Sequence, residues 1–68
     1  MKLSARNQLP GRVVAVHKGA TTGHVHIEIA GGATITASIT NEAIDDLAVK
    51  VGDSATAIIK ASDVIVGI

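Results

Sequence analysis

Two short segments, one early and one late in the chain, carry the side chains best suited to binding an anion. Ser4-Ala5-Arg6-Asn7 places a hydroxyl, a guanidinium and a carboxamide within four residues, and Lys60-Ala61-Ser62 combines an ammonium group with a second hydroxyl. Hydrogen bonds from charged donors to an oxyanion are about twice as strong as neutral ones, and N–H groups at a turn add further donors. Composition alone nevertheless favours the plainer interpretation that these residues are solvated charges and turn formers.

The elements that must position these segments are mostly short strands. β-branched runs and period-two alternation of apolar residues predict five of them, at residues 12–17, 24–29, 34–39, 54–60 and 64–66. Ala30-Gly31-Gly32 predicts a hairpin turn, since glycine tolerates positive φ. Pro10-Gly11 predicts a bend or bulge before the first strand, because proline cannot donate to a sheet. Residues 41–47 predict one short helix with Thr40 or Asn41 as its N-cap.

This order of elements predicts an all-β fold with one short helix, specifically a five-stranded Greek-key barrel of the oligonucleotide/oligosaccharide-binding (OB) type. The 68 residues form a single domain, 1–68. The chain is 47% hydrophobic but has no aromatic residue and no cysteine, so its own core is small and has no disulfide. We therefore predict an obligate oligomer that buries part of the apolar surface between subunits.

Charge and motifs argue against several classes of function. Six basic and six acidic residues give no net charge, and without aromatic side chains the chain lacks a stacking surface for nucleic acid. It has no long apolar run and no signal-peptide pattern, so we expect no membrane association and a cytoplasmic location. It shows no nucleophile motif or phosphate-binding loop, so we expect no enzyme. An OB-type nucleic-acid binder and a purely structural oligomeric module stay as alternatives.

The histidines form the other group of residues with possible chemistry. His24 and His26 alternate along one predicted strand and share a face, and His17 lies on the preceding strand. A His-x-His pair can bind zinc or copper. Because the sequence identifies no third ligand, we favour a polar sheet face of ordinary imidazoles and predict no metal-cation site.

Three motifs together resemble the molbindins, the Mop family of small molybdate- and tungstate-binding proteins. They are the opening Ser-Ala-Arg-Asn-Gln-Leu at 4–9, the Ala-Gly-Gly turn at 30–32 and the closing Ile-Lys-Ala-Ser-Asp-Val at 59–64. The resemblance extends over essentially the whole chain, in length and in the order of motifs. The same module resembles the ligand-binding part of the molybdate-dependent transcriptional regulator and the carboxy-terminal domain of molybdate transporter ATPases.

The resemblance implies an OB-like barrel assembled as a homohexamer, a trimer of dimers, that binds molybdate or tungstate between subunits for storage, buffering or homeostasis. It implies no organic cofactor. The implied oxyanion site, with its two segments on different subunits, comprises Ser4, Ala5, Arg6, Asn7, Thr40, Lys60, Ala61 and Ser62. A second oxyanion site near the three-fold axis would include Gly19, Ala20, Thr21 and Thr22.

Overall fold

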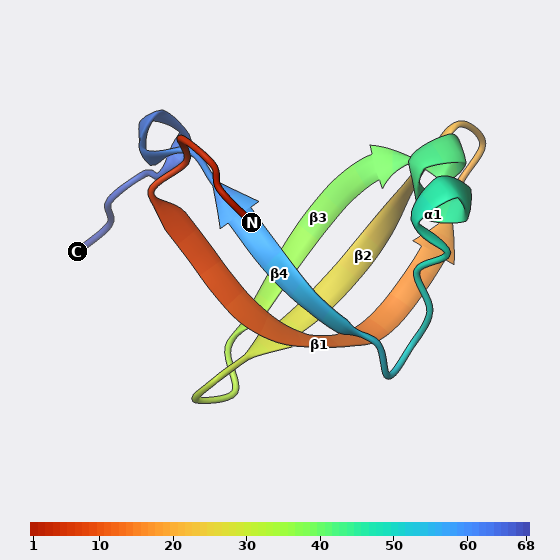
Figure 1. The fold of residues 1–68 in the computed structure, drawn as a ribbon, viewed down its shortest axis with the longest axis horizontal. Coiled ribbons are helices and arrows are strands. Elements are labelled where there is room, and N and C mark those ends of the chain that lie inside the picture. The colour runs from red at the N-terminus through yellow and green to blue at the C-terminus, as the bar shows by residue number, and fades with distance from the viewer.

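A computed structural model describes all of residues 1–68 as one curled antiparallel sheet with a single short helix (Figure 1). The strands are β1 (Asn7–Lys18), β2 (Thr22–Ile29), β3 (Thr34–Thr40) and β4 (Ser54–Ile59), in the spatial order β3-β2-β1-β4. Helix α1 (Asn41–Leu47) precedes β4, and a 3₁₀ turn, η1 (Ala61–Asp63), follows it. Three consecutive strands with a fourth returning beside the first is the Greek-key order. The predicted mostly-β fold with one helix is therefore confirmed.

The first strand differs from the prediction in its length and in the place of its irregularity. β1 starts at Asn7 and continues through Pro10 and Gly11, where we predicted a bend. The register with β2 shifts instead at Val14. Gly11 lets β1 and β2 approach closely, because a Cβ at this position would lie 2.3 Å from the carbonyl oxygen of Glu28. Glycine here thus allows β1 and β2 to pack without ending the strand.

The predicted fifth strand at residues 64–66 is not formed in the single chain, which has four strands. After β4, η1 turns the chain, with the Asp63 N–H donating to the Lys60 carbonyl at 2.9 Å, and the remaining residues lead away from the sheet (Figure 1). A strand requires a neighbouring strand for its hydrogen bonds, and this segment has none. Ile65 is therefore 93% exposed, and the barrel stays open, with β3 and β4 as its edges.

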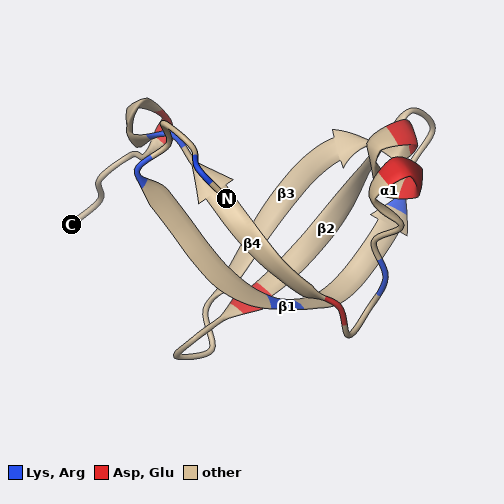
Figure 2. Ribbon diagram, in the orientation of Figure 1, with Lys and Arg blue, Asp and Glu red and all other residues tan.

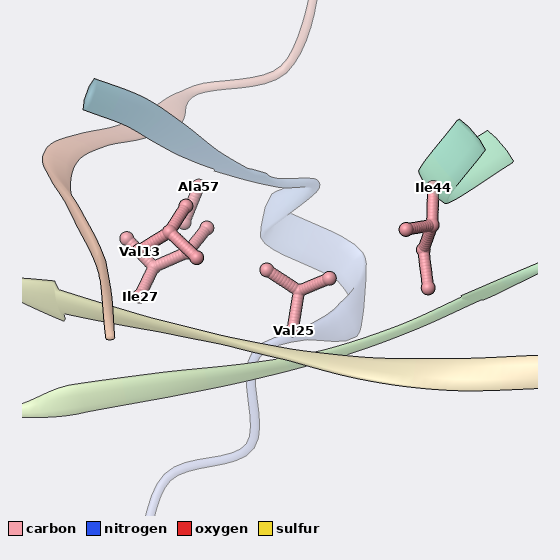
Figure 3. Packing of buried hydrophobic residues seen from close by; sticks show 5 residues of the cluster. All are labelled: Val13, Val25, Ile27, Ile44 and Ala57. Carbon is pink, nitrogen blue, oxygen red and sulfur yellow. The ribbon is translucent and has the colours of Figure 1, made fainter. Parts of the chain in front are cut away.

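The core lies inside the curl of the sheet and is small. Figure 3 shows Val13, Ile27 and Ala57 gathered from three strands, with Val25 between them and Ile44 of α1. These five are the buried hydrophobic residues of the chain. The helix thus closes one end of the curled sheet with a single buried side chain, which leaves the rest of the apolar residues partly or fully exposed.

The turns and caps follow the local sequence. The Thr40 hydroxyl accepts a hydrogen bond from the Ala43 N–H at 3.0 Å and caps α1, so of the two predicted cap candidates, Thr40 and Asn41, the cap is Thr40. Gly31 and Gly32 have φ values of 91° and 89°, which only glycine adopts readily, and they form the predicted hairpin turn. The local sequence therefore accounts for the turn between β2 and β3 and for the start of α1 after β3.

Candidate functional site

The pairing of β1 with β4 brings the two donor segments together at one end of the chain. Asn7 is opposite Ile59 in the sheet, and its side-chain amide donates to the Ile59 carbonyl at 3.1 Å across 52 positions of sequence. Arg6 lies just before Asn7 in the chain and Lys60 lies just after Ile59, so both come at the same end of the β1–β4 pairing. Figure 2 shows the resulting group of basic residues beside η1, where we define the cationic end as residues 2–7 and 60–62. The acidic Asp63 of η1 directly follows this group.

The two cations at the cationic end and the first two N–H groups of η1 have no partners within the chain. The ion pair of the structure joins Lys18 to Asp45, so neither Arg6 nor Lys60 is neutralised by a carboxylate. The first N–H of η1 that bonds to a carbonyl belongs to Asp63, which leaves the N–H groups of Ala61 and Ser62 unengaged. These donors are therefore available to an external acceptor.

The shape of the amino-terminal segment is set by contacts on either side of Arg6. The Gln8 amide donates to the Ala5 carbonyl at 3.3 Å, and Asn7 is tied to β4. In both contacts a side-chain amide donates to a backbone carbonyl and so fixes the backbone near Arg6. Asn7, which we predicted as an oxyanion ligand, thus also positions this segment. Lys2 adds a third cation to this end, although we did not predict it as part of the site. Its place two residues before Ser4 is the sequence feature that could have identified it.

Thr40 and the second candidate segment lie together at the other end of the molecule, beside α1. Thr22 and Thr40 are opposite each other in the sheet. Asn41 secures the preceding loop through two hydrogen bonds of 2.9 Å, from its side chain to the Gly19 carbonyl and from its backbone N–H to the Thr21 carbonyl. Within one chain, therefore, Thr40 is adjacent to the second candidate site and far from the first.

The loop at residues 19–22 offers a mixed set of polar groups. The N–H groups of Ala20 and Thr21 have no acceptor in the chain, which suits an anion. The Oδ1 atom of Asn41, however, is buried without a hydrogen-bond partner. A dianion has no proton to donate to that atom, so the loop also needs a separate donor such as water. The two candidate sites thus differ in chemistry as well as in place.

Fold and site together define a class of protein: a small Greek-key β-domain with an exposed set of hydrogen-bond donors for an anionic ligand. No group of three or more histidine, cysteine or acidic side chains is arranged to hold a metal ion. The chain belongs to the TOBE domain family, whose model matches residues 3–66, and within it to the molybdenum-pterin-binding (Mop) proteins. The family resemblance drawn from the three motifs is thereby confirmed.

Individual relatives match nearly the whole chain. Molybdenum-pterin-binding protein 3 from Clostridium pasteurianum is 53% identical over 66 residues, which are 97% of each chain. The structure of MopII from the same organism has a TM-score of 0.92, with 45% identity, and the match covers 98% of this chain and all of that one. A structure of the cytoplasmic molybdate-binding protein ModG with molybdate bound also has a TM-score of 0.92, at 46% identity, over 96% of this chain and 46% of that chain.

Proposed function

We propose that this chain binds molybdate or tungstate at its cationic end. The observation that carries the proposal is the Asn7–Ile59 pair, which aligns Arg6 and Lys60 as unpaired cations beside the free N–H groups of Ala61 and Ser62. Molybdate is a dianion without a proton near neutral pH, so it suits a site made of donors alone. The molybdate-bound structure of the related ModG supports the same ligand here.

We further propose that the functional state is an oligomer. A compact folded chain of 6.8 kDa is expected to expose about 4,000 Å², whereas this chain exposes 5098 Å². The difference of about 1,100 Å² is somewhat larger than the roughly 800 Å² that each partner buries in a standard interface. Exposed apolar side chains of the last five residues contribute to it, namely Val64, Ile65, Val66 and Ile68.

A groove between the two sheet edges indicates where these residues would bind. It has a volume of about 410 Å³ and lies between β3 and β4, with Ile27, Ile35 and Ala57 among its apolar lining residues. Both edges carry unpaired backbone groups, which favour the addition of a strand. We place residues 64–66 of a second copy in this groove, as the fifth strand that the sequence predicts and the single chain lacks.

This exchange would make the oxyanion site intersubunit. Lys60-Ala61-Ser62 immediately precedes the exchanged segment, so its donors would stand at the boundary between two copies. A second copy would also cover an anion that the open cationic end of one chain leaves largely in water, and it would bring in Thr40 of the neighbouring chain. We retain the trimer of dimers as the expected assembly, with Gly19, Ala20, Thr21 and Thr22 as the second site.

The role that fits these features is reversible binding of the oxyanion in the cytoplasm, for storage, buffering or homeostasis, by a single domain of residues 1–68. The relatives compared are named as binding proteins, which agrees with our expectation of no catalytic function. The helix of the structure is too short to cross a membrane.

Calorimetry with molybdate, tungstate and sulfate tests the proposal. We expect saturable binding of molybdate or tungstate at micromolar concentration and weaker binding of sulfate, which has the same charge and shape but is smaller. Native mass spectrometry with and without molybdate would give the subunit number and the count of bound oxyanions together. Failure of both molybdate and tungstate to bind at micromolar concentration would contradict the proposed function.

A further inference from the structure

The outer face of β1 and β2 brings three histidines together, at the end of these strands that leads into the 19–22 loop and far from the cationic end. His17 of β1 is directly opposite His24 of β2 in the sheet. His26 follows two residues along β2 and so projects from the same face. The rings of His17 and His26 have centroids 6.1 Å apart and planes at 77° to each other. The strand register thus places all three histidines on one face, with the rings of His17 and His26 as the near pair.

The spacing of His17 and His26 is close to that of two imidazoles on one metal ion. With Zn–N bonds of about 2.0–2.1 Å, two ligating rings have centroids roughly 5–6 Å apart. This spacing therefore allows both rings to ligate one ion once they turn a nitrogen toward it. Both rings are accessible to solvent, since His17 is exposed and His26 is only half-buried.

A neighbouring hydroxyl is placed to orient one of these rings. The Nδ1 atom of His26 lies 3.3 Å from the Oγ1 atom of Thr36 on β3. When Nδ1 carries the proton and donates to this hydroxyl, the lone pair on Nε2 is free for a metal. Metal-binding histidines commonly use their second nitrogen in this way, which fixes the tautomer and the ring orientation.

We propose that His17 and His26 bind one Zn²⁺ or Cu²⁺ ion on this face, with His24 turning in as a third ligand and water completing the coordination. Imidazole nitrogens suit both ions. The three rings do not converge on a common point in the structure, so the exposed His24 side chain must rotate on binding. The bound ion would connect β1 to β2 and stabilise the folded sheet over the unfolded chain.

Calorimetric titration of the untagged, chelator-washed full chain with Zn²⁺ tests this site. We expect one ion per chain with a dissociation constant in the micromolar range. His17→Gln and His26→Gln should each weaken binding at least tenfold. Glu28→Gln is the matched control, because Glu28 lies on the same face two residues beyond His26 and its removal should leave Zn²⁺ affinity unchanged.

Two further measurements separate the site from general surface binding. Thermal unfolding should show that Zn²⁺ raises the melting temperature of the wild type but not of His17→Gln, while unchanged circular dichroism shows that the variant is folded. Thr36→Val should weaken Zn²⁺ binding several-fold through the orientation of His26. No saturable Zn²⁺ binding below millimolar concentration, or equal affinity in wild type, His17→Gln and His26→Gln, would overturn the proposal.

Discussion

The cationic end and the helix end of this small domain are built from similar polar residues but use them differently. At the helix end, the Thr40 hydroxyl accepts from a backbone N–H, Asn41 holds the 19–22 loop, and Lys18 is paired with Asp45. At the cationic end, Arg6 and Lys60 have no carboxylate partner in the chain. Figure 2 shows the acidic residues of α1 beside basic residues, and a group of basic residues near η1, which carries the acidic Asp63.

The contrast teaches that the type of a polar residue does not reveal whether it serves the fold or a ligand. What distinguishes the two ends is whether the cations are already paired: Lys18 is bound to Asp45, whereas Arg6 and Lys60 have no carboxylate partner. A hydrogen bond made within the chain stabilises the fold but leaves little to offer a ligand, whereas an exposed unpaired donor costs the fold nothing. The variants below test this distinction, from the largest expected effect to the smallest.

The largest effect is expected from Ile65→Pro. If residues 64–66 of one copy pair with both β3 and β4 of another, a proline at 65 removes the N–H that bonds to one of these two strands, and its ring crowds that pairing. We expect loss of the oligomer and of molybdate binding, measured by light scattering and calorimetry. Ile65→Val is the matched control and should keep both. An Ile65→Pro protein that stays assembled and binds molybdate would show that the tail does not complete the site.

Arg6→Ala and Lys60→Ala should each weaken molybdate binding about tenfold to a hundredfold, since hydrogen bonds to charged groups are worth about 1.5–3 kcal/mol. Arg6→Lys should fall between Arg6→Ala and the wild type, because an ammonium lacks the planar fork of the guanidinium. Lys50→Ala is the control, since Lys50 is an exposed cation outside the cationic end. Equal loss in Lys50→Ala would mean that overall charge, rather than this site, attracts the anion.

Gly23→Ala should destabilise the helix end without altering the donors of the cationic end. A Cβ at this position would lie 2.6 Å from the His17 carbonyl oxygen and 2.6 Å from Cδ1 of Ile44, a core residue. Crowding of this kind costs about 1–3 kcal/mol, measurable by urea unfolding. Gly67→Ala, which meets no atom within 4 Å, is the control and should unfold like the wild type.

Thr40→Ala should lower the free energy of unfolding by about 1 kcal/mol through loss of the helix cap. Thr40→Ser keeps the hydroxyl and should restore most of that stability. Molybdate titration of the same variants then shows whether Thr40 has a second role. Unchanged affinity would leave Thr40 with its capping role alone, whereas a clear loss in Thr40→Ala, recovered in Thr40→Ser, would place its hydroxyl in a site shared with a neighbouring copy.

Much of the fold could be predicted because its signals are local. Alternation in residues 24–29 and 34–39 gave the second and third strands, and the glycines at 31 and 32 gave their turn. The acidic start of residues 41–47 after Thr40 gave the helix and its cap. In each case the physical cause lies within a few neighbouring residues, so a pattern in the sequence is sufficient to identify it.

The sequence by itself predicted the second and third strands, the turn between them and the short helix, and it offered the residues that we propose bind an oxyanion. Only the tertiary structure decided which segments meet. β1 pairs with β4, so the segments that carry Arg6 and Lys60 lie at the same end, while Thr40 lies with the 19–22 loop and His17 with His24 and His26. It also showed that residues 64–66 have no partner strand within the chain. These outcomes depend on register between distant segments, which the local chemistry of either segment does not specify.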